Sequence, residues 1–372
     1  MFSFGQISAR TLRYFAAIFT LALFAGTTSV QAHEKWFHDS KEYPLRFDLL
    51  MRPLPMAFVG AVLLATLAGG IVWKKWGREL VPGPENFGAS DARRSLLYGL
   101  VPLILGIHLA VPMLVNGVQG RLFSPDNQLS QPWNIFLGVA QTGIALAIFY
   151  GAFTRLAAVA LALLWVVGIF VVGLQPMLDN ALYLGFAGFF FCAGRGPISI
   201  DRFVVPFLEP SPRLIEYSMS FLRIGLGASL VFVSFTEKLA NIPLGTSFLS
   251  TYPLNFTTAL GIPMSNELFV LCAGAVELLV GLWILFGIFP REIVLIAWVP
   301  INMTLTIFNW SELIGHLPIY GTMAVLLLWS PGARNLKLWV DGVRNSIFPV
   351  EATSFSARQL LGTITKREPE NL

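Results

Sequence analysis

The residues with the clearest capacity for chemistry lie within or beside apolar runs in the second half of the chain. Glu277 lies near the middle of one such run, and Lys238 closes the run before it. An ionisable side chain in hydrocarbon is costly unless it is paired or faces a cavity, so both positions are candidates for function. A lysine can donate hydrogen bonds to a carbonyl, and a buried glutamate can exchange a proton. The alternative is an ion pair that only ties two helices together.

Further polar side chains lie close to these positions in the sequence, and their types suit hydrogen bonding to a ligand. They include the neighbours of Lys238, one residue of a later apolar run and two residues that open the last run: Glu237, Asn241, Asn302, Glu312 and His316. His108 lies alone in an apolar run of the first half. A histidine there is more often satisfied by a helix carbonyl than used as a ligand, although such donors can hold a quinone carbonyl.

A metal site is suggested by the segment that follows the first apolar run. If an export signal is removed after Ala32, His33 offers both its free α-amine and its imidazole to one ion, and His38 can supply a third nitrogen. These ligand types suit Cu(II). The alternative is an ordinary polar stretch at a membrane surface.

Residues 1–32 have the features of such a signal. Two arginines precede the apolar stretch Tyr14–Ala25, and Val30 and Ala32 place small residues where signal peptidase cuts. We expect cleavage after Ala32, which leaves residues 33–54 as a short extracytoplasmic segment. Without cleavage the signal would become an extra helix, and that segment would still end outside.

The elements that position these residues are membrane helices, because 55% of the 372 residues are hydrophobic and only 12% are charged. The mean hydropathy is +0.68, and a soluble chain carries roughly 25% charge. The net charge of +4 is divided among short basic clusters between apolar runs. That pattern sets topology and predicts no nucleic-acid partner.

Other common sites are missing from the sequence. Cys192 and Cys272 both lie in apolar runs without a CxxC pair, so neither a thiol relay nor a thiolate metal site is indicated. There is no Walker loop, no dinucleotide GxGxxG after a strand and no HExxH motif. The GRGP sequence at 194–197 predicts a helix exit and turn, not a phosphate cradle.

The apolar runs predict an all-α membrane protein with about nine transmembrane helices after the signal peptide. The expected spans are Pro55–Trp73, Leu96–Val115, Ile135–Phe153, Leu156–Leu174, Met177–Ala193, Phe221–Leu239, Leu268–Phe289, Ile293–Phe308 and Ile314–Trp329. Alternate loops and the tail place sixteen basic residues on one side and six on the other. The positive-inside rule therefore predicts a bacterial-type inner-membrane protein with an extracytoplasmic mature N-terminus and a cytoplasmic tail, residues 340–372.

The apolar runs also contain an internal repeat. A shift of 136 residues superposes Gln141–Arg155 on Glu277–Arg291, with glycine, phenylalanine and arginine in register. We interpret this as two parallel four-helix units, residues 96–203 and 221–339, with the helix of residues 55–78 outside both. The alignment pairs glutamine with Glu277, and Asn180 with His316. The second unit keeps the charges and is the better active-site candidate.

The second unit resembles the DoxX/DoxD family. The matching segments are Leu222–Gly227, Glu237–Asn241 with Pro243, and Gly274–Gly281, and in the first unit Gly194–Asp201 is similar to the closing turn of the family. The family consists of four-helix membrane proteins and includes subunits of thiosulfate:quinone oxidoreductases. The resemblance implies a tandem pair of such units, and it implies the fold more firmly than the reaction.

From the resemblance we expect a membrane subunit of a quinone-linked redox system. A quinone headgroup would lie near Lys238, Glu277 and His316, with His108, Glu237, Asn241 and Asn302 as further contacts. The sequence shows no electron carrier, so this role requires a soluble or membrane redox partner, and whether the chain is itself an enzyme stays open. The alternatives are a transporter or permease that uses the interface between the two units, and an outer-surface copper-binding protein.

Overall fold

In the computed structural model, residues 34–36, 42–329 and 331–345 are described, and every regular element among them is helical. The predicted signal, His33, His38 and most of the predicted tail lie outside the described residues. Six helices in these described ranges are long and apolar enough to cross a membrane, which confirms the helical membrane class. They are α3 (Pro53–Trp76), α4 (Asp91–Val118), α5 (Trp133–Tyr150), α6 (Thr154–Val171), α10 (Pro212–Val233) with its continuation η5 (Ser234–Leu239), and α12 (Asn266–Phe286).

The predicted span Met177–Ala193 is divided into two helices. α7 (Leu174–Asp179) ends at Asn180, and α8 (Ala181–Ala193) begins directly after it. The Asn180 side chain donates a hydrogen bond to the carbonyl of Pro176, at 2.9 Å. This local bond competes with the helix ladder and accounts for the break.

The last two predicted spans belong to one continuous helix, α13 (Pro290–Leu328). This helix cannot be straight, because Arg291 at its start donates to the carbonyl of Leu328 at its end, at 3.4 Å. At 1.5 Å per residue these two residues would lie roughly 55 Å apart along a straight helix. Tyr320 also donates to the carbonyl of Ile301, at 3.2 Å. The helix therefore folds back on itself into two antiparallel arms.

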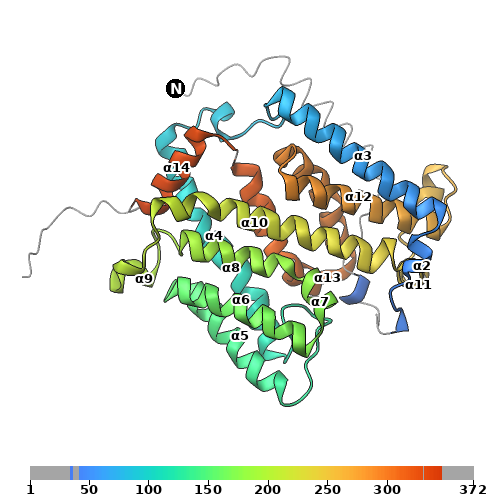
Figure 1. The fold of residues 1–372 in the computed structure, drawn as a ribbon, viewed down its shortest axis with the longest axis horizontal. Coiled ribbons are helices and arrows are strands. Elements are labelled where there is room, and N and C mark those ends of the chain that lie inside the picture. Colours follow the sequence, from blue (N-terminus) through green and yellow to red (C-terminus); the bar gives the residue numbers. More distant parts are fainter. Residues whose placement is uncertain (1–33, 37–41, 330, 346–372) are drawn as a thin grey trace, which may run out of the picture.

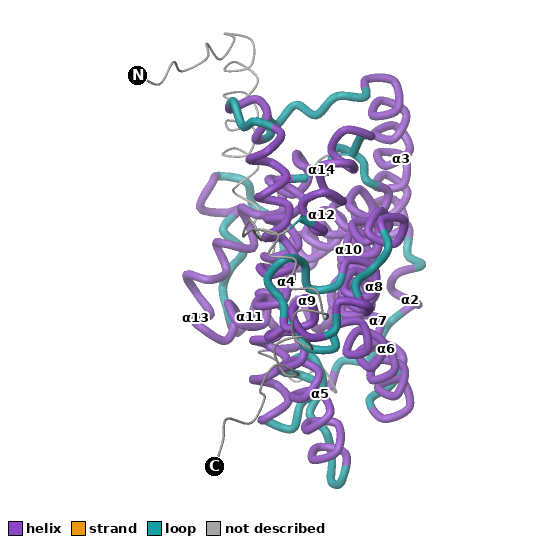
Figure 2. Tube along the Cα trace, turned by 90° about the vertical axis from the view of Figure 1, so that its left-hand side faces the viewer, coloured by secondary structure: helices purple, strands orange, loops and turns teal. Residues whose placement is uncertain are grey.

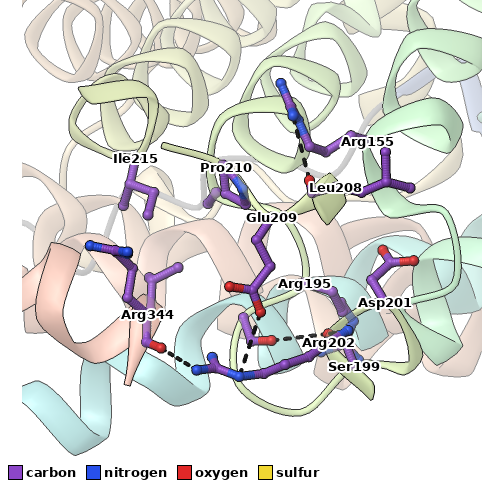
Figure 3. A pocket seen from close by; sticks show the side chains of 14 residues that line it. Arg155, Arg195, Ser199, Asp201, Arg202, Leu208, Glu209, Pro210, Ile215 and Arg344 are labelled. Carbon is purple, nitrogen blue, oxygen red and sulfur yellow. Dashed lines mark hydrogen bonds and ion pairs between the residues drawn. The ribbon is translucent and has the colours of Figure 1, made fainter. Parts of the chain in front are cut away.

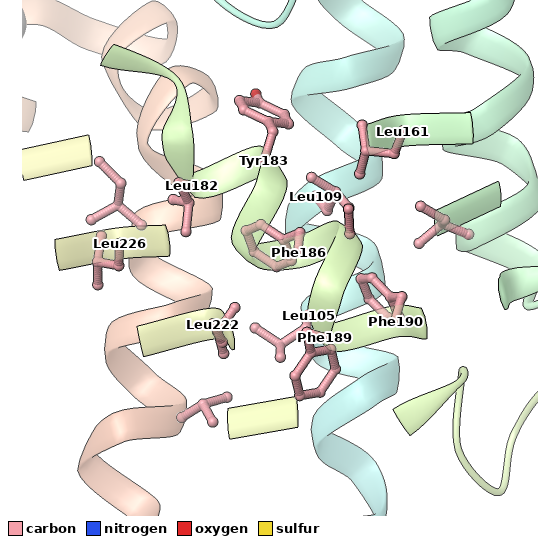
Figure 4. Close-up of a cluster of buried hydrophobic side chains, with 14 of the residues drawn as sticks. Leu105, Leu109, Leu161, Leu182, Tyr183, Phe186, Phe189, Phe190, Leu222 and Leu226 are labelled. Atoms are coloured by element: carbon pink, nitrogen blue, oxygen red, sulfur yellow. The ribbon is translucent and has the colours of Figure 1, made fainter. Parts of the chain in front are cut away.

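Short α8 lies at the centre of the bundle and is covered by longer helices. Figure 4 shows its aromatic side chains between leucines of α4, α6 and α10. The backbones of α8 and α10 approach closely at Gly185 and Gly225: a Cβ on Gly185 would lie 2.8 Å from the Cα atom of Gly225. Glycine at both positions allows the tight packing that holds helices together where no hydrophobic effect drives them.

α3 lies at the margin of the bundle and packs against α12 (Figure 1). Leu64 and Leu67 are 70% and 63% exposed, and its buried side is narrow. A helix that is apolar all round and exposed over most of its surface suits a lipid environment.

The two ends of the bundle carry different short elements. At the end that we name the α14 end lie α14 (Ala333–Arg344), α9 (Ile200–Val204), η4 (Pro206–Leu208) and η3 (Pro84–Phe87). At the opposite end, the α11 end, lie α11 (Ile242–Thr251), α2 (Phe47–Leu50), η1 (Glu34–Trp36) and η6 (Thr257–Leu260). Figure 1 shows α14 and α9 on the left and α11 and α2 on the right, and Figure 2 looks onto the bundle from the left.

Two helix connections have the same backbone conformation. Gly151 and Phe153 join α5 to α6 with φ values of 68° and 50°, and Gly287 and Phe289 join α12 to α13 with φ values of 68° and 43°. A left-handed conformation is favourable for glycine and costly for phenylalanine. The two turns lie 136 residues apart in the sequence.

Candidate functional site

The candidate site begins where α10 ends. The last turn of this helix, η5, is a π-helix, and the amide of Ala240 donates to the carbonyl of Phe235 at 2.9 Å. Pro243 follows in the next helix and has no amide hydrogen for the ladder. A single π-turn widens the helix locally and is frequent at functional sites. Here it presents Glu237 and Lys238 as successive buried side chains.

Lys238 and Glu277 form the ion pair at the centre of the site. The Nζ atom of Lys238 lies 3.1 Å from Oε2 of Glu277, and the lysine is fully buried. α12 can approach this closely because it has Gly274 one turn before Glu277: a Cβ there would lie 2.9 Å from the Cβ atom of Lys238. Two residues that the sequence marks as costly in an apolar run therefore meet in the fold.

Two more carboxylates surround the same ammonium group. Nζ of Lys238 lies 3.9 Å from Oε1 of Glu34 and 3.9 Å from Oε2 of Glu237. The backbone amide of Glu34 donates to Oε2 of Glu237, at 2.8 Å. Neither carboxyl oxygen of Glu34 has a hydrogen-bond partner within the part of the chain that the structure describes. Burial raises the pKa of Glu34 to about 8, against the opposing effect of Lys238.

A second ion pair lies beside the first. Nζ of Lys35 lies 2.6 Å from Oδ2 of Asp179 and donates to Oγ1 of Thr236 at 2.9 Å, and Thr236 donates to Oδ1 of Asp179 at 2.8 Å. This triangle ties η1 to α7 and to η5. We name the six ionisable residues together the Lys238 cluster: Glu34, Lys35, Asp179, Glu237, Lys238 and Glu277.

The sequence did not indicate Glu34, Lys35 or Asp179 as site residues. Glu34 and Lys35 lie in the segment that the sequence marks as a candidate metal site, and Asp179 lies near the start of a predicted span. A signal was nevertheless present, since an acidic residue next to an apolar run is a candidate for pairing with a buried lysine.

Asn241 and His316 lie close to the cluster but outside its centre. The Asn241 side chain donates to the carbonyls of Tyr43 and Thr236, at 3.0 and 3.2 Å, and so anchors the incoming chain. Nδ1 of His316 lies 3.2 Å from Oε1 of Glu312, and its ring lies 4.9 Å from the ring of Trp36, the last residue of η1. His316 therefore contacts the segment that carries Glu34, and its acidic partner is Glu312.

Two other predicted contacts have purely local partners. Nδ1 of His108 lies 2.7 Å from the carbonyl of Ile104, one turn earlier in α4. The side chain of Asn302 donates to the carbonyl of Trp298, also one turn earlier, at 2.7 Å. The arrangement at His108 is the helix-carbonyl alternative that the sequence favoured.

The charges of the cluster affect the protonation of its carboxyl groups. Two lysines face four carboxyl groups, and a pKa of about 8 keeps Glu34 protonated at pH 7. Loss or gain of the Glu34 proton changes the charge balance next to Lys238, 3.9 Å away.

No group of three or more histidine, cysteine, aspartate or glutamate side chains in the described ranges is arranged to hold a metal. The predicted copper ligands His33 and His38 lie outside these ranges. No family model, no curated protein and no solved structure matches the chain. The resemblance to the DoxX/DoxD family therefore stays a prediction.

Proposed function

We propose that this protein is the membrane subunit of a quinone-linked redox system and that the Lys238 cluster exchanges the proton that accompanies electron transfer. The observation that carries the proposal is one buried ammonium group among three carboxyl groups, of which Glu34 has a raised pKa and accepts no hydrogen bond from the described residues. Reduction of a quinone to a quinol consumes two electrons and two protons. A partner protein supplies the two electrons, Glu34 of the cluster supplies one proton, and water at the outer face supplies the second proton and reprotonates Glu34.

The type and position of the side chains support this role. Lys238 can donate a hydrogen bond to a quinone carbonyl, and Glu34 can release its proton when the developing oxyanion takes it. His316 lies against Trp36 at the same end of the molecule. The quinone itself is implied by the family resemblance alone.

The proposal includes two related four-helix units in tandem and the orientation of the protein in the membrane. The matching left-handed turns at Gly151 and Gly287 support two related four-helix units. The excess of basic residues in the loops at the α14 end supports a cytoplasmic position for that end. The Lys238 cluster then lies toward the outer face of the membrane.

The test is to purify the protein in mild detergent and to quantify bound quinone by mass spectrometry in wild type, Glu34→Gln and Glu277→Gln. We expect quinone in the wild type and at least a tenfold loss in both variants. Gln141→Leu is the matched control, because it alters a buried polar side chain on α5 whose hydrogen-bond partners are backbone groups outside the cluster. Equal quinone in all four proteins, or none in the folded wild type, would reject the proposal.

The alternative of a proton-coupled permease would use the same cluster. The contact between Gly185 and Gly225 weighs against it, because it closes the interface of α8 and α10 where a substrate path between the two units would run. Uptake into vesicles driven by a proton gradient and lost in Glu277→Gln would favour the permease.

A further inference from the structure

A second charged site lies at the α14 end, far from the Lys238 cluster, and is lined by four arginines. The pocket has a volume of about 30 Å³ and lies among the end of α8, α9, η4, the start of α10 and the end of α14. Figure 3 shows Arg155, Arg195, Arg202 and Arg344 around it. Asp201 and Glu209 are its acidic residues.

Both carboxylates are already engaged. Asp201 accepts hydrogen bonds from the backbone amides of Phe153 and Thr154 and so caps the start of α6. Glu209 lies 3.6 Å from Nε of Arg202. The other three arginines have no carboxylate partner in the part of the chain that is described, so the pocket keeps an excess of positive charge.

Arg195 is the most deeply buried of the four arginines. It is 3% exposed, its Nε donates to the carbonyl of Ile148 at 2.8 Å and its Nη2 donates to the carbonyl of Phe149 at 2.9 Å. Its Nη1 atom has no hydrogen-bond partner among the described residues. Burial lowers the pKa of the Arg195 guanidinium to about 10, so the group stays charged at pH 7.

Two glycines make room for this guanidinium. A Cβ on Gly106 would lie 2.6 Å from Nε of Arg195, and a Cβ on Gly151 would lie 2.5 Å from its Cγ. The sequence around Arg195 predicts a turn without a phosphate cradle. The turn is present, with φ values of 63° and 76° at Gly194 and Gly196, and it buries a cation with one free donor.

Exposed apolar side chains lie beside the pocket. Phe203, Val204 and Phe207 belong to α9 and η4, and they are 75%, 68% and 81% exposed. Exposed aromatic and aliphatic side chains beside arginines are typical of the boundary between headgroups and acyl chains. Basic pockets between membrane helices bind the phosphates of anionic lipids.

We propose that this pocket binds the phosphate group of an anionic phospholipid. Arg195 donates its unpartnered Nη1–H to a phosphate oxygen, and Arg344 supplies a second positive charge from the end of α14. Phe203 and Phe207 lie beside the acyl chains. The backbone carbonyl of Arg344 already accepts a hydrogen bond from Arg202, so α14 is held in position at the rim.

The test uses the full chain in detergent, with lipid retention measured by native mass spectrometry and lipid-induced thermal stabilisation. The probes are phosphatidylglycerol, phosphatidylcholine and inorganic phosphate. We expect preferential retention of phosphatidylglycerol, a loss of at least tenfold in Arg195→Gln and a loss of about fivefold in Arg344→Gln. Arg93→Gln, an exposed arginine at the same end, should bind like the wild type.

Arg344→Gln keeps the test decisive if Arg195→Gln folds poorly, because the Arg344 side chain makes no ion pair or hydrogen bond within the described residues. Equal retention of phosphatidylglycerol by Arg344→Gln, Arg93→Gln and wild type would overturn the proposal. Stabilisation by inorganic phosphate alone, with no preference between the two lipids, would overturn the lipid as the source of the phosphate.

Discussion

Gln141 on α5 and Glu277 on α12 lie 136 residues apart, and both are buried polar side chains near the centre of an apolar helix. The side-chain oxygen of Gln141 accepts from the amide of Phe123 at 2.9 Å, and its nitrogen donates to the carbonyls of Met113 and Arg121, at 2.9 and 3.2 Å. All its partners are backbone groups. Glu277 instead faces the ammonium group of Lys238 at 3.1 Å.

The difference separates a structural polar site from a reactive one. A neutral amide with three backbone partners holds a loop in place and has no proton to exchange. A lysine among three carboxylates, one with unpartnered oxygens, can change its protonation without a change of fold. The region around Glu277 is therefore a better candidate for function than the region around Gln141.

The largest effect is expected from Lys238→Ala, which removes the ammonium group that faces Glu34, Glu237 and Glu277. Removing one partner of a buried ion pair costs about 3–5 kcal/mol. The free energy of unfolding, measured by SDS titration in mixed micelles, should fall by this amount. The double variant Lys238→Met with Glu277→Leu should recover part of the loss, because Glu34 and Glu237 remain, and a loss below about 1 kcal/mol in Lys238→Ala would contradict the pairing.

Gln141→Glu should cost about 3 kcal/mol, because a carboxylate would face the carbonyls of Met113 and Arg121 where the amide nitrogen now donates. Gln141→Met of similar length keeps the volume and serves as the control for shape. The same titration measures both variants. A Gln141→Glu protein as stable as the wild type would show that the first region tolerates charge and would remove the contrast between the two regions.

Glu34 should make stability depend on pH. Its pKa is about 8 in the folded protein, against 4.5 for an unperturbed glutamate, so the folded state favours the protonated form. The stabilisation is complete below pH 4.5 and is lost as the pH rises toward 8, with a slope of at most about 1.4 kcal/mol per pH unit.

Unfolding between about pH 5 and 8 in wild type and Glu34→Gln measures this slope. The variant should lose the part of the pH dependence that belongs to Glu34. An unchanged slope in Glu34→Gln would show that the carboxyl group is ionised throughout and would remove it from the proton-exchange role.

The smallest effect is expected at His108, whose ring bonds to the carbonyl of Ile104 in its own helix. His108→Asn should change the free energy of unfolding by less than about 1 kcal/mol and leave bound quinone unchanged. Mass spectrometry of the purified variant is the measurement. Loss of quinone in His108→Asn would move the headgroup away from the Lys238 cluster and into the first half of the chain.

The sequence alone determined the helical membrane class, because the length and apolarity of the runs depend only on the bilayer as solvent. It also singled out Lys238 and Glu277, because a charge within an apolar run is costly wherever the helix lies. Their contact depends on the close approach of α12 to α10, which Gly274 permits. It also depends on the π-turn that ends α10.

Only the tertiary structure brought Glu34 to Glu237 and Lys35 to Asp179, contacts that span 203 and 144 residues. The same is true of Arg195, whose side chain lies against Gly106 of α4 and Gly151 at the end of α5. Periodicity and hydropathy indicate whether each segment prefers lipid, water or the protein interior. They do not determine which segments meet, since that depends on how all the helix surfaces pack at once.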